Sequence, residues 1–66
     1  MSDDLATLRA EIKKLSGAAI TLKMDLHDLS EELPIGWQRI MDVAERTQEA
    51  YRKLHDARER LKALEG

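Results

Sequence analysis

The sequence predicts an all-α protein that folds into one antiparallel two-helix hairpin. Three observations support this: two long stretches of apolar residues spaced three and four positions apart, one Pro–Gly break between them, and matching residues on either side of the break. The composition agrees, because 36% of the residues are charged and only 3% are aromatic, which is typical of coiled-coil proteins. We expect a single domain over residues 1–66.

The first helix is predicted over about residues 3–32. Its apolar residues alternate at intervals of three and four, which places them on one face as the seam of a coiled coil. The small residues at 16–19 include a helix-weakening glycine, but they also let a second helix come close. The seam of this helix comprises Leu5, Leu8, Ile12, Leu15, Ala19, Leu22, Leu26, Leu29 and Leu33.

The elbow is predicted over about residues 33–37. Pro34 disfavours helical geometry at the residue before it, and Gly36 can adopt a positive φ angle. Trp37 follows directly, and it either closes the open end of the hairpin or offers an anchor to a partner protein, since tryptophan is enriched at the centres of interfaces. The helix therefore ends here and the chain reverses.

The second helix is predicted over about residues 38–64. If the chain folds midway between Pro34 and Ile35, each of its seam residues faces one from the first helix, from Leu29 opposite Ile40 to Leu5 opposite Leu64. This match predicts an antiparallel register with its closest contact at Ala19 and Ala50. The second seam comprises Ile40, Val43, Thr47, Ala50, Leu54, Ala57, Leu61 and Leu64.

A second stripe of mostly apolar residues lies near the elbow, whereas the flanking positions towards the termini are charged. A hairpin of 66 residues without cysteine has little core of its own, so a wide apolar face needs a cover. We expect a second copy, which would give a four-helix dimer, or another protein. The stripe comprises Gly17, Ile20, Met24 and His27 on the first helix and Trp37, Met41, Ala44, Gln48, Tyr51 and His55 on the second.

His27 is the one candidate metal ligand that we single out. Asp28 is its neighbour and Glu31 lies one turn further on, so two copies meeting here could share a divalent metal between two imidazoles. Established zinc sites show more ligands and spacings such as HExxH, so the alternative is a histidine that packs or donates a hydrogen bond at an interface. We expect no required cofactor.

Several functional classes find little support. The sequence contains no Ser-His-Asp or Cys-His set and no glycine-rich phosphate loop, so we expect no enzyme. A net charge of −2 with alternating acids and bases argues against nucleic acid, although an RNA-binding hairpin stays a rival hypothesis. No apolar run is long enough to cross a membrane, and the acidic "MSDDLATL" start is unlike a targeting peptide, so we expect a cytoplasmic protein.

The segment "KMDLHDLSEELP", with the tryptophan after it and the later "VAERTQEAY", resembles the small Rop-like proteins encoded in bacterial nitrogen-fixation gene clusters. The resemblance covers about Leu5 to Leu61. It implies a short helical hairpin, usually dimeric, that is a non-catalytic accessory of nitrogenase. His27 matches the histidine of the family's "DLHDL" segment, which is linked to a divalent metal between two copies.

From the resemblance and the apolar stripe together, we predict that the chain binds a nitrogenase component. The predicted partner is the molybdenum–iron protein in a particular assembly, cofactor-deficient or inactivated state. A divalent-metal-responsive homodimer is the alternative. The predicted partner-binding residues are Met24, His27, Asp28, Glu31, Leu33, Trp37, Met41 and Tyr51.

Overall fold

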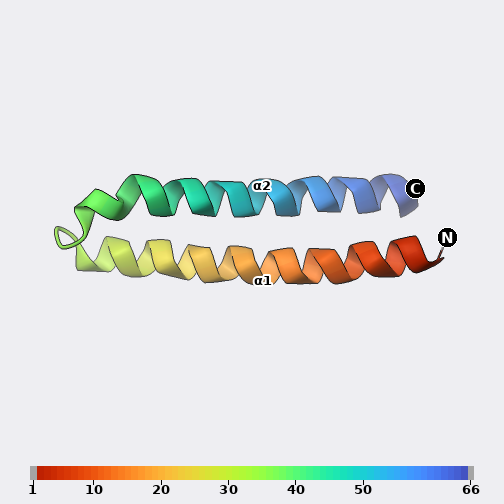
Figure 1. Ribbon diagram of the computed structural model, residues 1–66, viewed down its shortest axis with the longest axis horizontal. Coiled ribbons are helices and arrows are strands. Elements are labelled where there is room, and N and C mark those ends of the chain that lie inside the picture. The colour runs from red at the N-terminus through yellow and green to blue at the C-terminus, as the bar shows by residue number, and fades with distance from the viewer. Residues whose placement is uncertain (1, 66) are drawn as a thin grey trace.

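The protein is a two-helix hairpin, described over residues 2–65 by a computed structural model, with side chains from residue 4 (Figure 1). Helix α1 spans Ser2–Glu32, a short 3-10 turn η1 spans Trp37–Arg39, and helix α2 spans Ile40–Glu65. The helices run antiparallel side by side, so the elbow lies at one end and both termini lie at the other. The molecule measures 50 × 14 × 13 Å, and the predicted all-α antiparallel hairpin is confirmed.

The core is a single line of seam residues between the helices. No charged or polar side chain is buried among the described residues, and every buried side chain is an aliphatic one from the predicted seams. Most other seam residues are half-buried, whereas Leu33, Ile40 and Leu64 at the two ends are each 37% exposed or more. The buried residues are Leu8, Ala19, Leu29, Val43, Leu54 and Ala57.

The register follows the predicted match of the two seams. Thr47 donates its hydroxyl to the Val43 carbonyl at 2.8 Å, and the same oxygen lies 3.4 Å from the Leu22 carbonyl on the facing helix. Thr47 and Leu22 are therefore opposite each other, as the sequence predicts. Ala19 is 0% exposed, which agrees with a close approach of the helix backbones at this level.

The elbow is a compact turn stabilised by backbone hydrogen bonds. Ile35 donates to the Glu32 carbonyl at 3.0 Å, and Arg39 donates to the Gly36 carbonyl at 2.9 Å. Gly36 adopts a left-handed conformation with φ 80° and ψ 12°, which explains the glycine there. Because η1 precedes α2, the second α-helix begins two residues later than the sequence pattern suggests.

Neither α1 nor α2 is apolar over a stretch long enough to cross a membrane, as judged over the described residues 2–65.

Candidate functional site

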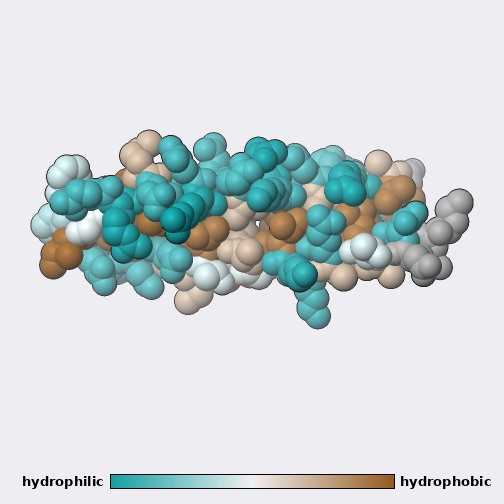
Figure 2. Space-filling view, viewed as in Figure 1, coloured by the Kyte–Doolittle hydropathy of each residue, from teal (hydrophilic) through white to brown (hydrophobic). Residues whose placement is uncertain are grey.

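The elbow carries a patch of apolar side chains that the hairpin itself does not cover. Ile35 is 74% exposed, Met41 68%, Trp37 61% and Leu33 42%. We call these four residues the elbow patch. Figure 2 shows hydrophobic side chains at this end of the molecule, and others along the line between the helices and towards the terminal end, with hydrophilic side chains over much of the rest of this face. Contiguous exposed apolar residues of this kind mark interaction sites.

Trp37 belongs to this exposed patch more than to the closure of the hairpin. Its side chain follows a glycine in the left-handed region and starts the short η1 turn, so it leaves the line between the two helices. At 61% exposure, most of the indole surface is available to a partner. The contact that does close the elbow involves Leu29, which is 4% exposed and approaches Gly36.

All eight predicted partner-binding residues are exposed, but they divide over different sides of the hairpin. An ion pair between Arg9 and Glu65, at 2.7 Å, marks one flank of the helix pair. Tyr51 and Trp37 precede Glu65 by whole heptads, and His27 follows Arg9 by about five helical turns, so these side chains share that flank. Met41 follows Trp37 by about one turn and extends the same side.

The other predicted residues of α1 lie further round that helix. Asp28 follows His27 and is rotated by about 100° from it, towards the opposite flank. Met24, which is 60% exposed, and Glu31 are directed away from α2 on the outer face. The structure therefore brings His27, Trp37, Met41 and Tyr51 to one flank and leaves Met24, Asp28 and Glu31 outside it.

His27 has carboxylates near both ring nitrogens. Nδ1 lies 3.8 Å from the Asp28 carboxylate, and Nε2 lies 3.5 Å from the Glu31 carboxylate. A metal on either nitrogen would thus meet one histidine and one carboxylate from this chain. Three or more such ligands gather nowhere in the described part of the chain, so a closed site would need ligands from a second copy.

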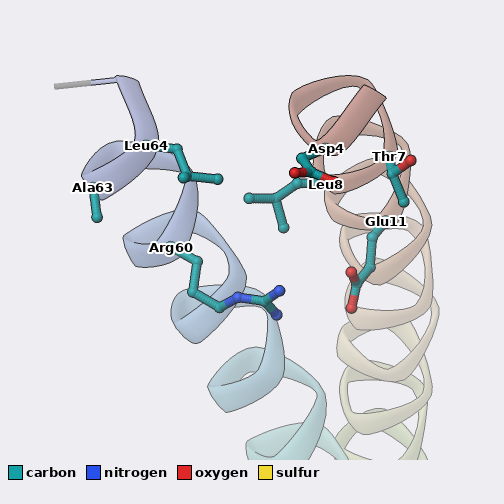
Figure 3. Close-up of a pocket in the computed structure, with 7 residues that line it drawn as sticks. All are labelled: Asp4, Thr7, Leu8, Glu11, Arg60, Ala63 and Leu64. Carbon is teal, nitrogen blue, oxygen red and sulfur yellow. The ribbon is translucent and has the colours of Figure 1, made fainter. Parts of the chain in front are cut away.

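A hollow of about 550 Å³ opens between the helices at the terminal end. Figure 3 shows the Leu8 and Leu64 side chains directed towards each other across it, while Arg60 extends from α2 towards α1. Asp4 and Glu11 supply carboxylates on the α1 side. Leu64, a seam residue that lines this hollow, is 59% exposed.

A second hollow, of about 450 Å³, lies on the flank opposite to Tyr51. Its floor contains apolar seam residues beside Ala18, and Arg46 and Lys53 stand at its edge. The sequence analysis missed the pattern behind it: on this flank α1 repeats an acid every seven residues and α2 repeats a base, except at Ala18. The acids are Asp4, Glu11, Asp25 and Glu32, and the bases are Arg39, Arg46, Lys53 and Arg60.

Charge is also divided along the length of the hairpin. Residues 18–51, which we call the elbow half, contain seven acidic and three basic residues, for a net charge of −4. The remainder, the terminal half, contains six acidic and eight basic residues, for a net charge of +2. The elbow half is therefore the acidic end of a charge dipole and also carries the apolar patch.

Where the two halves meet, Arg52 binds two carboxylates. It donates to Glu49 through Nε at 3.0 Å and to Asp56 through Nη1 at 3.1 Å. The hydrogen bond from Arg52, aided by its positive charge, lowers the pKa of Glu49. In return, the hydrogen bond to Glu49 raises the pKa of Arg52. Arg52, Glu49 and Asp56 thus pair with one another within α2, and we do not include them in the candidate site.

Comparison with known proteins agrees with this geometry. The model of a family described as Rop-like matches residues 3–66, so the chain belongs to the Rop-like family. A UPF0437 protein of Azorhizobium caulinodans is 55% identical over 62 residues, covering 94% of this chain and 90% of that protein. A Frankia alni relative, described as a UPF0437 protein in the nifX-nifW intergenic region, is 49% identical and is matched over 77% of this chain and 62% of its own length.

The fold also matches a solved structure. A protein determined by NMR as a Northeast Structural Genomics Consortium target is 57% identical, with a TM-score of 0.85. The match covers 91% of this chain and 84% of that one. The hairpin is therefore the fold of a solved relative as well as of this chain.

Proposed function

We propose that this Rop-like chain is a non-catalytic accessory protein of nitrogen fixation that binds a nitrogenase component. We propose the molybdenum–iron protein as the partner, in a particular assembly, cofactor-deficient or inactivated state. The site of action would be the cytoplasm. Within its family, the chain resembles the accessory protein called nitrogenase-associated factor T, and the proposed role follows that resemblance.

The observation that carries the proposal is the exposed elbow patch. A hairpin whose largest apolar side chains lie in solvent has a surface suited to docking, and tryptophan is enriched among residues that dominate binding energy. The link to nitrogen fixation is supported by the relative described from the nifX-nifW region. That description concerns the relative, and its transfer to this chain is part of the proposal.

The mechanism would be docking of a preformed surface. The patch lies on and beside a turn fixed by hydrogen bonds and by Gly36, so little ordering is needed on binding. Since a second copy that used the flank of His27, Trp37 and Tyr51 would cover the same side chains, self-association and partner binding would compete. The proposal then requires a homodimer to open, or to use another face, before it binds.

The experiment is a binding measurement on purified molybdenum–iron protein, in its mature and cofactor-deficient forms, with three versions of this chain. Trp37→Ala removes an apolar side chain that is 61% exposed in the elbow patch, and Leu64→Ala removes one that is 59% exposed at the terminal end. We expect Trp37→Ala to weaken binding by about tenfold or more and Leu64→Ala to leave it unchanged.

Two results would contradict this proposal. The first is that no form of the molybdenum–iron protein binds the unaltered chain. The second is that an intact dimer docks through its terminal half, so that Leu64→Ala weakens binding and Trp37→Ala does not.

A divalent-metal-responsive homodimer is the second candidate, favoured by the placement of His27 between Asp28 and Glu31. On this hypothesis zinc or nickel at low micromolar concentration raises the sedimentation coefficient, and His27→Ala abolishes the shift. His55→Ala is the matched control, since His55 is also an exposed histidine on a helix, but on α2. Equal sedimentation with and without metal would exclude this candidate.

A further inference from the structure

We propose that the partner surface is an apolar cleft rimmed by lysine or arginine side chains, and that the acidic end of α1 steers the elbow patch into it. This inference rests on the proposed function and adds the chemistry of the partner. It starts from two features that lie next to each other, the elbow patch and the charges around it.

The chain is strongly acidic immediately before the patch. Four carboxylates lie between Asp25 and Glu32, and no lysine or arginine occurs from residue 24 to residue 38. All four are exposed to solvent. The elbow patch, at residues 33, 35, 37 and 41, follows directly. Glu31 and Glu32 directly precede Leu33, so a partner that covers the elbow brings its rim close to these two carboxylates, whereas Asp25 and Asp28 lie one to two turns further back along α1.

These acids lie towards the carboxyl end of α1, where negative charge destabilises a helix. The carboxyl end of a helix carries a partial negative charge and favours basic side chains in its last turn. The last turn of α1 has no basic residue, and Glu31 and Glu32 occupy it. The unfavourable charge remains exposed next to an unfavourably exposed apolar patch, and one basic-rimmed apolar surface would relieve both.

The hairpin compensates this charge only in part, because Arg39 and Arg46 lie on the flank of Asp25 and Glu32 without forming a close ion pair with them. Within residues 4–65, Asp25 and Glu32 make no ion pair, and Asp28 and Glu31 approach only the imidazole of His27. By contrast, Asp42 of α2 lies 3.5 Å from Arg46, and Asp56 lies 3.1 Å from Arg52. Asp4, Glu11 and Glu59 of the terminal half also make no ion pair within residues 4–65, so what sets the four acids of α1 apart is their position directly before the patch.

A second copy of the chain fits this surface poorly. Two elbow halves placed together would bring net charges of −4 and −4 into contact. The terminal half has the opposite charge, +2, but Leu64 is its one large apolar side chain that is exposed in the described residues. The charges therefore favour a different protein as the partner, one whose binding surface has both an apolar floor and a basic rim.

The test measures the association rate with purified molybdenum–iron protein at increasing salt. Rim charges act mainly on the association rate and its salt dependence, and steering accelerates encounter by about tenfold or more at low salt. We expect the rate for the unaltered chain to fall by about tenfold between low and high salt. The D25N/D28N/E31Q/E32Q variant should associate slowly even at low salt. Its association rate should lose most of the salt dependence, and its dissociation rate should change little.

The matched control is D4N/E11Q/D56N/E59Q, which neutralises two aspartates and two glutamates of the terminal half. It should keep the fast, salt-sensitive association. Binding that is insensitive to salt, or that loses its salt dependence in the control variant, would overturn the inference and leave the proposed function standing. Absence of binding at every salt concentration would overturn both.

Discussion

The two halves of this hairpin share one fold but differ in what they leave exposed. Among its described residues, the terminal half, with net charge +2, exposes one large apolar side chain, Leu64. The elbow half has net charge −4 and exposes eight such side chains, including Ile35, Met41 and Trp37. The difference shows that the additional apolar residues near the elbow contribute little to the hairpin's own core.

The largest expected effect contrasts the core with the patch. Leu54, 4% exposed, lies in the seam, and Leu54→Ala should lower the free energy of unfolding by about 2–5 kcal/mol through lost burial and a cavity. Ile35, 74% exposed, belongs to the patch, and Ile35→Ala should change it by less than about 0.5 kcal/mol. Urea unfolding measures both.

A large destabilisation by Ile35→Ala would contradict this contrast between the core and the patch. It would mean that the patch is already covered in the folded state in solution, as in a dimer formed through the elbow. Repeating the unfolding curve at several protein concentrations separates the two cases, because only an oligomer becomes more stable with concentration.

Two glycines provide the second contrast. Gly36 has φ 80°, and an added Cβ would lie 3.1 Å from a methyl carbon of Leu29, so Gly36→Ala should cost about 1–2 kcal/mol. Gly17 lies inside α1 with nothing within 4 Å of an added Cβ, so Gly17→Ala should stabilise the protein by about 0.5–1 kcal/mol. Thermal unfolding should shift in opposite directions, and a shift of the same sign for both would contradict the turn geometry.

A smaller effect is expected from the ion pair that joins the ends. Arg9 and Glu65 meet at 2.7 Å, but their side chains are 58% and 48% exposed. Arg9→Gln should therefore lower the free energy of unfolding by less than about 1 kcal/mol, and the loss should disappear at high salt. Unfolding curves at low and high salt measure this, with Arg58→Gln as a control that keeps the Arg9–Glu65 pair. A salt-independent loss above that limit would show that the pair does more than close the terminal end.

The smallest effect concerns pH at the boundary between the halves. The pKa of Glu49 is lowered in the folded protein, chiefly by the hydrogen bond from Arg52. A lowered folded pKa stabilises the protein above the unfolded pKa, and this contribution is lost as the pH falls through the folded pKa. In an NMR titration, Arg52→Gln should raise the pKa of Glu49 towards its ordinary value, whereas Arg46→Gln should not. An unchanged Glu49 titration in Arg52→Gln would refute the assigned cause.

The helices and their register were predictable because periodic seams report directly on the contact between helices. Leu22 opposite Thr47 and the buried Ala19 follow from spacing and the position of the Pro–Gly break. The candidate site was harder to predict from the sequence. Spacing identified Trp37 and Met41, but it grouped them with Met24, Asp28 and Glu31, which the structure places on other sides of α1. The η1 turn was also missed, since a three-residue helix leaves no periodic signal.

The hairpin, the seam and the acidic, apolar character of the elbow could all be predicted from the amino-acid order, because they depend on residue type and on spacing along one helix. Which side chains share a flank depends on how α1 and α2 rotate towards each other, so it became visible in the folded hairpin. The fold also shows which seam residues stay exposed, namely Leu33 and Ile40 at the elbow and Leu64 at the terminal end.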